Sequence, residues 1–269
     1  MKNKYKNIIY DPWFAQILQR DVYRLVVDDE LIEKSREPAL RESAGQVPTG
    51  QVYDLLRELQ SKPLFMYAKV STTSLFASQF LERVGFNLVD TNVIFNKPIA
   101  PRSKFAAHCA VRFAVSSDKS QVMEVARKNF VYSRFHLDRA IPNLLANKIK
   151  AEWVGNYFPT SLDYSVGKRG DEMVVAVVDE RVVGFLQLLR RNEGQLIIDL
   201  IAVDASQRRK GIASDMIAYA ESKCHGCERI LVGTQVANIP SIRLYEKIGF
   251  RLCASKYVFH YHNLPLEEA

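Results

Sequence analysis

The chain has 269 residues, of which 48% are hydrophobic and 25% are charged, a balance typical of a globular protein with a sizeable core. Its formal net charge of +7 favours anionic partners but does not distinguish a nucleotide-containing ligand from nucleic acid or an acidic membrane. No apolar stretch approaches the length of a membrane span, and the basic segment Met1–Asn7 has no apolar run after it. We therefore expect a cytoplasmic protein without a signal peptide.

The N-terminal part contains a unit that recurs near the C-terminus. Leu64–Val70 predicts a strand, and Ser74–Val84 predicts a helix that ends at Gly85. A shift of 164 positions brings this glycine onto Gly249 and Phe86 onto Phe250. An internal repeat of one supersecondary unit explains the match, and chance similarity of two strand–helix–strand units is the alternative.

The middle of the chain predicts a mixture of helices and antiparallel strands. Two prolines make Asn96–Ser103 the best linker candidate, and it divides the chain into residues 1–100 and 101–269. After the linker we expect a strand, a helix, an aromatic basic loop, a second helix and a hairpin that turns at Asp179-Glu180. These elements span Ala110–Val115, Ser117 or Asp118 to Lys128, Asn129–Asp138, Ile141–Tyr157, Glu172–Val178 and Val182–Leu189.

The four cysteines include one pair with CxxC spacing, Cys224 and Cys227. His225 lies between them, so a metal site is one reading, but the sequence offers no second ligand pair at a suitable spacing. The segment falls at the end of a predicted helix, where Gly226 has an ordinary capping role. We expect incidental thiols in a reducing compartment and no bound metal.

The stretch from Gln195 onward predicts a strand, a turn, a helix, a strand and a helix in succession, which is typical of α/β folds. The elements are Gln195–Val203, a basic turn, Ala213–Lys223, Ile230–Val236 and Ser241–Lys247. At the turn, the first amides of a helix and the positive end of its dipole meet the cations Arg208, Arg209 and Lys210, and Gly211 allows close approach of a ligand. This pattern favours a phosphate or pyrophosphate site, and an ordinary solvated loop is the alternative.

Two motifs in this order resemble those of the GCN5-related N-acetyltransferases (GNAT). They are Arg208-x-x-Gly211-x-Ala213 after an apolar strand, and Asn238 followed by Leu244-Tyr-Glu-Lys-Ile-Gly-Phe250. The resemblance covers about Val111 to Tyr261 and implies a GNAT fold, an α/β mixed sheet, preceded by a degenerate GNAT-like lobe. In that first copy Leu81 replaces Tyr245 and Ser74 replaces Asn238, so it has lost the chemistry.

The resemblance implies an acetyl-CoA-dependent acyltransferase that needs no metal. By similarity, main-chain groups of strand residues would bond the acetyl carbonyl and pantetheine, amides of the basic turn would hold the pyrophosphate, and the Asn238 side chain would bond the CoA arm. Tyr245 would protonate the leaving thiolate, because a tyrosine carries its proton at neutral pH. The residues concerned are Ile201, Ala202 and Val203 on the strand, Arg208, Arg209, Lys210, Gly211, Ile212 and Ala213 in the turn, and Asn238 and Ser241 after the second strand.

The sequence does not identify the general base. Asp199 has the same parity as Ile197 and Ile201, so an unbulged strand would place it on their face. A carboxylate in such surroundings is unusual. The family commonly bulges this strand, and an ordered water often serves as the base. Asp199 is therefore a candidate catalytic residue with a structural role as the alternative.

Local details narrow the resemblance to the bacterial dTDP-fucosamine N-acetyltransferases, which acetylate the 4-amino group of a dTDP-linked sugar. These details are Asp11-Pro-Trp-Phe14 with Val22-Tyr-Arg-Leu25, and the Ser133-Arg-Phe135 loop ahead of Glu152-Trp153. We expect Arg134 and His136 to border the acceptor, with surface residues of a solvated loop as the alternative. A peptide amine as acceptor, a non-catalytic CoA-binding module and, most weakly, nucleic-acid binding are the competing functions. The sequence leaves the acceptor and the oligomeric state open, including a homodimer.

Overall fold

A computed structural model describes residues 6–28, 31, 51–58, 62–99, 107–158, 171–191, 194–224 and 226–263. The chain forms two compact units. The first contains Met1–Asn92, Leu137–Pro142 and Ser255–Ala269, and the second contains Val93–His136 and Asn143–Ala254. The expected division near residue 100 lies close to the first of these boundaries, but two later segments also join the first unit.

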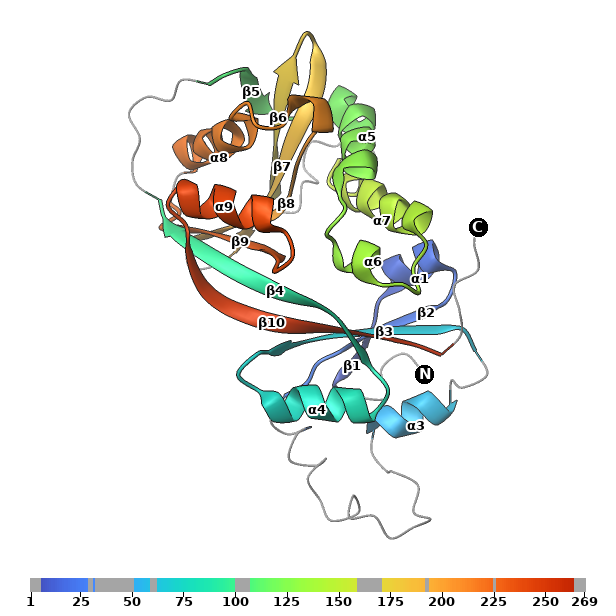
Figure 1. Cartoon of the computed structure of the whole chain (residues 1–269). Coiled ribbons are helices and arrows are strands. Elements are labelled where there is room, and N and C mark those ends of the chain that lie inside the picture. The colour runs from blue at the N-terminus through green and yellow to red at the C-terminus, as the bar shows by residue number, and fades with distance from the viewer. Residues whose placement is uncertain are drawn as a thin grey trace. The chain divides into compact units, whose positions relative to one another are not determined.

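The first unit is built on strands β1 (Ile8–Tyr10), β2 (Asp21–Leu25), β3 (Leu64–Ser71) and the end of β10 (Arg251–His262), which are neighbours in this order. β2 and β3 are parallel, and the other two pairings are antiparallel. Helices α3 (Gln51–Glu58) and α4 (Leu75–Arg83) cover one face of these strands, and α1 (Pro12–Leu18) lies on the other (Figure 1). Alternation along β3 explains this, because Leu64, Met66 and Ala68 join the core cluster with α4, whereas Phe65 and Tyr67 face away from it.

The second unit has the strand order β4-β9-β8-β7-β6-β5. Strand β4 (Asn87–Pro98) is followed in the chain by β5 (Ala110–Phe113), β6 (Asp171–Val178), β7 (Arg181–Arg191), β8 (Gln195–Val203) and β9 (Arg229–Gln235). β8 and β9 are parallel, whereas β5 to β8 pair antiparallel. The β6–β7 hairpin turns where the sequence predicts it, with φ of 47° at Asp179 and 60° at Glu180. Two positive φ values are what a tight type I′ hairpin turn requires.

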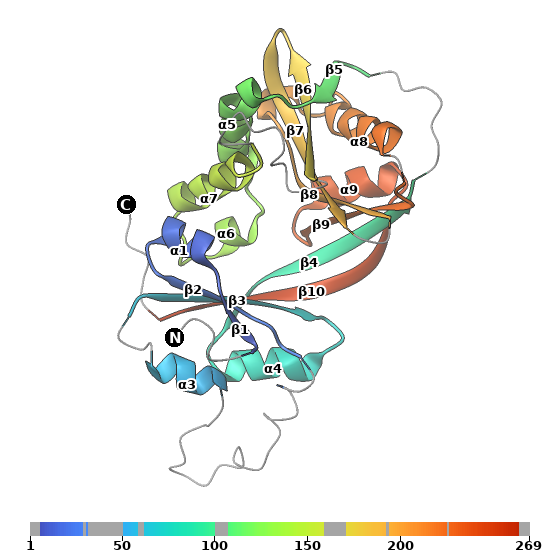
Figure 2. The ribbon, with the colours of Figure 1, turned by 180° about the vertical axis from the view of Figure 1, so that it is seen from behind.

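Helices cover both faces of the sheet in the second unit, as the two opposite views show (Figures 1 and 2). On one face lie α8 (Ile212–Lys223) and α9 (Ile239–Lys247), which pack on a core cluster that includes Leu196, Ile198 and Phe250. On the other lie α5 (Lys119–Asn129) and α7 (Asn143–Gly155), which pack on a separate cluster that includes Phe185 and Leu200. A mixed sheet with helices on both faces is the α/β architecture expected from the sequence.

The repeated unit has matching local geometry in its two copies. Gly85 after α4 has φ of 92°, and Gly249 after α9 has φ of 95°. The Phe86 amide donates to the Leu81 carbonyl at 2.9 Å, and the Phe250 amide donates to the Tyr245 carbonyl at 2.9 Å. The two helix ends therefore close in the same way. The helix starts differ, because Asn238 caps α9 with its side chain and Ser74 makes no such bond.

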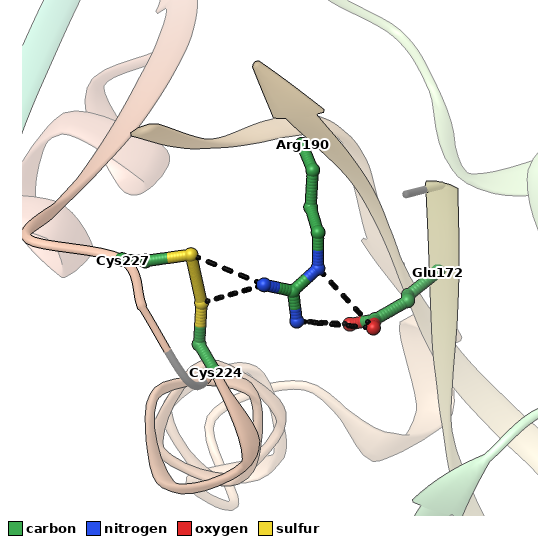
Figure 3. The surroundings of a disulfide bond; sticks show 4 residues. All are labelled: Glu172, Arg190, Cys224 and Cys227. Carbon is green, nitrogen blue, oxygen red and sulfur yellow. Dashed lines mark hydrogen bonds and ion pairs between the residues drawn. A yellow bond between two sulfur atoms is a disulfide. The ribbon is translucent and has the colours of Figure 1, made fainter. Parts of the chain in front are cut away.

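Two expectations from the sequence are wrong, one for the linker and one for the cysteine pair. The linker candidate begins inside a strand, because Asn96–Pro98 belong to β4, and its residues from 100 onward lie outside the described residues. The cysteines of the CxxC pair are not incidental thiols, because Cys224 and Cys227 form a disulfide (Figure 3). His225 between them also lies outside the described residues, and no helix among those described is long and apolar enough to cross a bilayer.

Candidate active site

Strand β8 carries a β-bulge at Asp199. Gln187 of β7 pairs with Leu200 and Leu188 pairs with Ile198, so Asp199 is the extra residue opposite no partner. Because of the bulge, the residues that face each helix layer have the opposite parity before and after Asp199. Leu196 and Ile198 before it belong to the α8–α9 cluster, whereas Leu200 and Ala202 after it belong to the α5–α7 cluster, and Ile201 and Val203 take over the α8–α9 side. A bulge re-aims side chains in this way.

The bulge directs the Asp199 carboxylate toward α7. Trp153 donates its indole N–H to Asp199 Oδ2 at 3.0 Å, and the Gln187 amide donates to the same oxygen at 3.3 Å. An unbulged strand would place this carboxylate on the same face as Ile201 and Val203. In the structure it does not lie on that face. Gln187 is fully buried, and its Oε1 has no hydrogen-bond partner. A buried acceptor without a partner is costly, so the Gln187 Oε1 is suited to accept a bond from a further donor.

Strands β8 and β9 part at the bulge. Their parallel ladder runs from Gln195↔Arg229 to Ile198↔Val232, and the chain of β8 continues to Val203 paired only with β7. The part of β8 that does not pair with β9 contains the residues whose main-chain groups are predicted to bond the acyl group, Ile201, Ala202 and Val203. Backbone N–H and C=O groups require partners, so this edge can accept an extended arm as an additional strand.

The basic turn after β8 has the conformation of an anion-binding loop. Arg209 and Gly211 have positive φ, 66° and 84°, on either side of Lys210. Residues that alternate between right-handed and left-handed backbone conformations point successive N–H groups toward one concave side. Helix α8 begins at Ile212, one residue before the expected Ala213, so its free amides and positive dipole end face the same place.

The His108 ring packs against Gly211, where a side chain would not fit. A Cβ built there would lie 2.8 Å from both Cε1 and Nδ1 of the His108 ring. His108 is held by Asp215 of α8, which accepts its backbone N–H at 2.7 Å and lies 3.0 Å from its Nδ1. No sequence motif contains His108, and its partner Asp215 lies 107 residues away, so this contact is not visible in the sequence.

The cations of the turn are only partly free to meet a ligand. The Arg208 guanidinium donates to the Val203 carbonyl at 3.2 Å and to the Asn129 side chain at 3.0 Å, which joins the turn to the end of β8 and to α5. Lys210 donates to Gln207 at 2.8 Å. All three basic residues are exposed. Their charge therefore strengthens a site that the backbone forms.

The second motif forms the start of α9. Asn238 accepts the Ser241 amide at 3.3 Å and donates to the Thr234 hydroxyl at 3.1 Å, so its side chain caps the helix. Tyr245 lies two turns further, is 2% exposed and packs with Phe95 and Phe250. Burial raises the pKa of its phenol well above its usual range, which keeps the hydroxyl protonated.

Arg134 and His136, the predicted acceptor residues, are not part of a solvated loop. Arg134 is buried, and its guanidinium lies 4.6 Å from the centre of the Phe135 ring. His136 lies between Ser133 Oγ, 2.6 Å from its Nδ1, and Asn147 Oδ1, 2.9 Å from its Nε2. Burial lowers the pKa of this imidazole, which favours the neutral ring with its proton on the side of Asn147.

An additional buried cation, Lys150 of α7, lies beside these groups. Its ammonium is 4.8 Å from the centre of the Phe130 ring, 5.1 Å from that of Trp153 and 5.8 Å from that of Phe135. Phe135 thus contacts both cations, and Trp153 joins Lys150 to Asp199. The sequence offered one weak signal for this arrangement, a lysine one helical turn before a tryptophan, which many surface helices also show.

One cluster in the first unit has the composition of a metal site. Asp138, His260 and His262 offer ligand atoms that all lie within 4.8 Å of one another. Asp138 Oδ2 lies 2.6 Å from His260 Nδ1 and 2.8 Å from His262 Nε2, which are hydrogen-bond distances. Burial raises the pKa of Asp138, but the hydrogen bonds and charges of the two histidines outweigh it and hold the pKa below its usual range. Within the described residues this is the candidate cluster, and its contacts are those of a hydrogen-bonded triad.

Comparison with known proteins agrees with this geometry. Residues 142–250 match the model of the acetyltransferase (GNAT) family. A curated relative, the spore coat polysaccharide biosynthesis protein SpsD of Bacillus subtilis, is 33% identical over 156 residues, which are 56% of this chain and 50% of the relative. The chain thus spans about half the length of that relative.

Solved structures share the fold at low identity. A conserved protein of unknown function from Staphylococcus epidermidis has a TM-score of 0.61 at 14% identity, with 98% of this chain and 94% of that chain covered. A GCN5-related N-acetyltransferase from Sphaerobacter thermophilus has a TM-score of 0.59 at 13% identity, with 97% and 78% covered. The motif-bearing elements, the parted strands and the family match lead to one conclusion: residues 142–250 carry a domain similar to the acetyltransferases of the GNAT family.

Proposed function

We propose that the chain transfers the acetyl group of acetyl-CoA directly to a primary amine of a nucleotide-linked amino sugar. The observation that carries this proposal is the bulge at Asp199, because it brings the donor and acceptor sides together on one strand. On one side of the bulge β8 parts from β9 next to the anion-binding turn. On the other its carboxylate accepts a hydrogen bond from the indole of Trp153 on α7.

On the donor side the chain supplies backbone groups. The turn from Arg208 to Ala213 would hold the pyrophosphate, because a helix N-terminus with a glycine approach suits a phosphate group. The unpaired edge of Ile201–Val203 would hold the pantetheine arm and orient one N–H toward the acyl oxygen. Negative charge builds on this oxygen when an amine attacks, and an oriented N–H stabilises it. In this proposal the start of α9 lies further along the same arm, with Asn238 and Ser241 joined to each other by the capping bond.

Two side chains would move protons. Attack of the amine forms the C–N bond, and collapse of the tetrahedral intermediate breaks the C–S bond and leaves a thiolate. Tyr245 would donate its proton to this thiolate, since burial keeps the phenol protonated. Asp199 would accept the proton released by the amine, directly or through a water, because its carboxylate is oriented by Trp153 and Gln187.

The acceptor side favours an anionic molecule. Arg134 and Lys150 are both buried, and both face the Phe135 ring. Positive charge here would attract the diphosphate of a nucleotide-sugar and repel a basic peptide. The name of the SpsD relative places that protein in polysaccharide biosynthesis, which supports an amino sugar as acceptor. A peptide amine remains the second candidate in the same enzyme class.

The test measures CoA release from acetyl-CoA with dTDP- and UDP-amino sugars and with basic peptides. We expect turnover with a nucleotide-sugar and, for Lys150→Met, a rise of about tenfold in KM for that acceptor, equivalent to about 1.4 kcal/mol. Methionine keeps the apolar contact with the three rings and removes the charge. Lys148→Met is the matched control, because Lys148 lies on the same helix and is exposed.

The outcomes separate the candidate functions. Turnover with peptides alone would overturn the sugar proposal and leave the acetyltransferase class intact. Tight binding of acetyl-CoA without turnover on any amine would favour a non-catalytic CoA-binding module. An equal effect of the two lysine substitutions would exclude Lys150 from the acceptor site. Asp199→Asn keeps an acceptor for the Trp153 indole, and we expect kcat to fall about a hundredfold if Asp199 is the base.

A further inference from the structure

The disulfide Cys224–Cys227 lies at the opposite end of β8 and β9 from the anion-binding turn. Cys224 is the cap of α8, and Cys227 precedes the first residue of β9, Arg229. That residue pairs with Gln195, the first residue of β8, whereas the turn follows the last residue of the same strand. The pair is therefore separate from the groups assigned to acetyl transfer.

A guanidinium from β7 contacts both sulfur atoms. Arg190 Nη1 lies 3.3 Å from Cys227 Sγ and 3.5 Å from Cys224 Sγ (Figure 3). The opposite edge of the guanidinium meets the carboxylate of Glu172 on β6, with Nη2 and Nε at 3.0 and 3.3 Å from its Oε1. Glu172 thus orients Arg190 so that one N–H group points at the disulfide. Both cysteines are partly exposed, which gives a small molecule access to them.

We propose that Cys224 and Cys227 form a thiol–disulfide exchange site whose substrates are low-molecular-weight disulfides. In the reduced chain a thiolate of the pair attacks a sulfur of the small disulfide, forms a mixed disulfide and releases one thiol. The second cysteine then attacks the mixed bond, closes Cys224–Cys227 and releases the second thiol. One small disulfide is reduced to two thiols, and the protein dithiol is oxidised by two electrons.

Arg190 provides the reason for reactivity at this pair. The thiolate is the nucleophile in exchange, and an adjacent cation stabilises it. The C-terminal end of α8 works against a thiolate, because its dipole is negative there. A guanidinium at contact distance opposes this effect with a full charge and a hydrogen bond. Since Nη1 reaches both sulfur atoms, it stabilises a thiolate formed at either cysteine.

The two remaining cysteines lack this arrangement and serve as internal comparisons. Burial raises the pKa of the Cys109 thiol, which disfavours its reactive form. Cys253 is exposed, and its thiol donates to the Ile94 carbonyl at 3.3 Å. Neither has a second cysteine within CxxC spacing, so neither can release a mixed disulfide by the same route.

The experiment equilibrates the full chain in mixtures of reduced and oxidised glutathione and then alkylates it for peptide mass spectrometry. We expect Cys224 and Cys227 to convert reversibly to the disulfide within this range, with two thiols released for each oxidised glutathione consumed. The Cys224→Ser variant removes the resolving step in one direction, so we expect a stable glutathione adduct on Cys227. A pair that stays reduced, or one that glutathione cannot reduce, would overturn the proposal.

A second measurement isolates the role of Arg190. The rate of iodoacetamide capture of the reduced pair at neutral pH reports its thiolate, and Arg190→Met should slow it about tenfold. Arg191→Met is the matched control, because it removes the same charge from the next, exposed position of β7. Equal rates for the two variants would show that Arg190 does not activate the pair. Melting temperatures of both variants identify any loss from unfolding, and acetyl transfer is not part of either readout.

Discussion

Replacing Gly211 with alanine would perturb the basic turn at the residue that lies against the His108 ring. The residue has φ of 84°, and a left-handed backbone costs a non-glycine residue about 1–2 kcal/mol. The new Cβ would also lie 2.8 Å from the His108 ring, which is closer than van der Waals contact allows. The ring would have to move from Asp215, and because its side chain is 66% exposed this contact adds at most about 1 kcal/mol.

The expected loss of stability is therefore about 2 kcal/mol. For a domain of this size it corresponds to a fall in Tm of about 4–8 °C. Gly226→Ala is the matched control, because Gly226 has φ of 76° and nothing within 4 Å of the added Cβ. It should show the backbone cost alone. The double substitution of Gly211 and His108 by alanine should recover the part of the loss that comes from the ring.

Calorimetric titration with CoA tests the binding role of the same residue. A Cβ at Gly211 would strain the left-handed backbone and displace the His108 ring beside the turn, so we expect CoA to bind at least about tenfold more weakly, a loss of about 1.4 kcal/mol. Gly226→Ala should bind CoA as the unmodified chain does. Equal CoA affinities for the Gly211→Ala and Gly226→Ala variants would refute the assignment of this turn to the pyrophosphate.

Three other expectations concern single side chains. Tyr245→Phe should lower kcat for CoA release about a hundredfold with little change in KM, because it removes the proton donor; a decrease of less than about threefold would exclude this role. Asp118→Ala should cost about 1–3 kcal/mol in urea unfolding, because the buried carboxylate accepts bonds from Arg112 at 2.6 and 2.9 Å and the Arg112 side chain is 44% exposed; an unchanged midpoint would contradict the ion pair. Asp138 has a depressed pKa in the folded chain, so its stabilisation is present above the carboxyl pKa of the unfolded chain, about 3.9, and is lost as pH falls through the folded value. Asp138→Asn should therefore be less stable at neutral pH and lose less stability on acidification, and parallel acid unfolding curves would disprove this.

Local sequence was enough for features that arise within a few residues. The turn at Gly211, the hairpin turn at Asp179-Glu180, and the matching ends at Gly85 and Gly249 were all predicted from short stretches of neighbouring residues. The order of strands and helices after Gln195 follows from short apolar periods in the same way. Because each of these features depends on residues that are neighbours in the sequence, the motifs alone were enough to show the family resemblance.

Tertiary structure decided the features that join distant parts of the chain. Trp153 and Asp199 meet across 46 positions, and the bulge that permits this contact depends on the pairing of β8 with β7. The Lys150 ammonium contacts the rings of Phe130, Phe135 and Trp153, and Arg190 reaches Cys227 across 37 positions. These contacts depend on register and on the packing of helices against the sheet, and a one-residue slip of a strand would turn its side chains to the other face. The sequence by itself therefore determined the resemblance to the family and the motifs that carry it, whereas the contacts of Asp199 and Lys150 and the environment of the disulfide came from the three-dimensional fold.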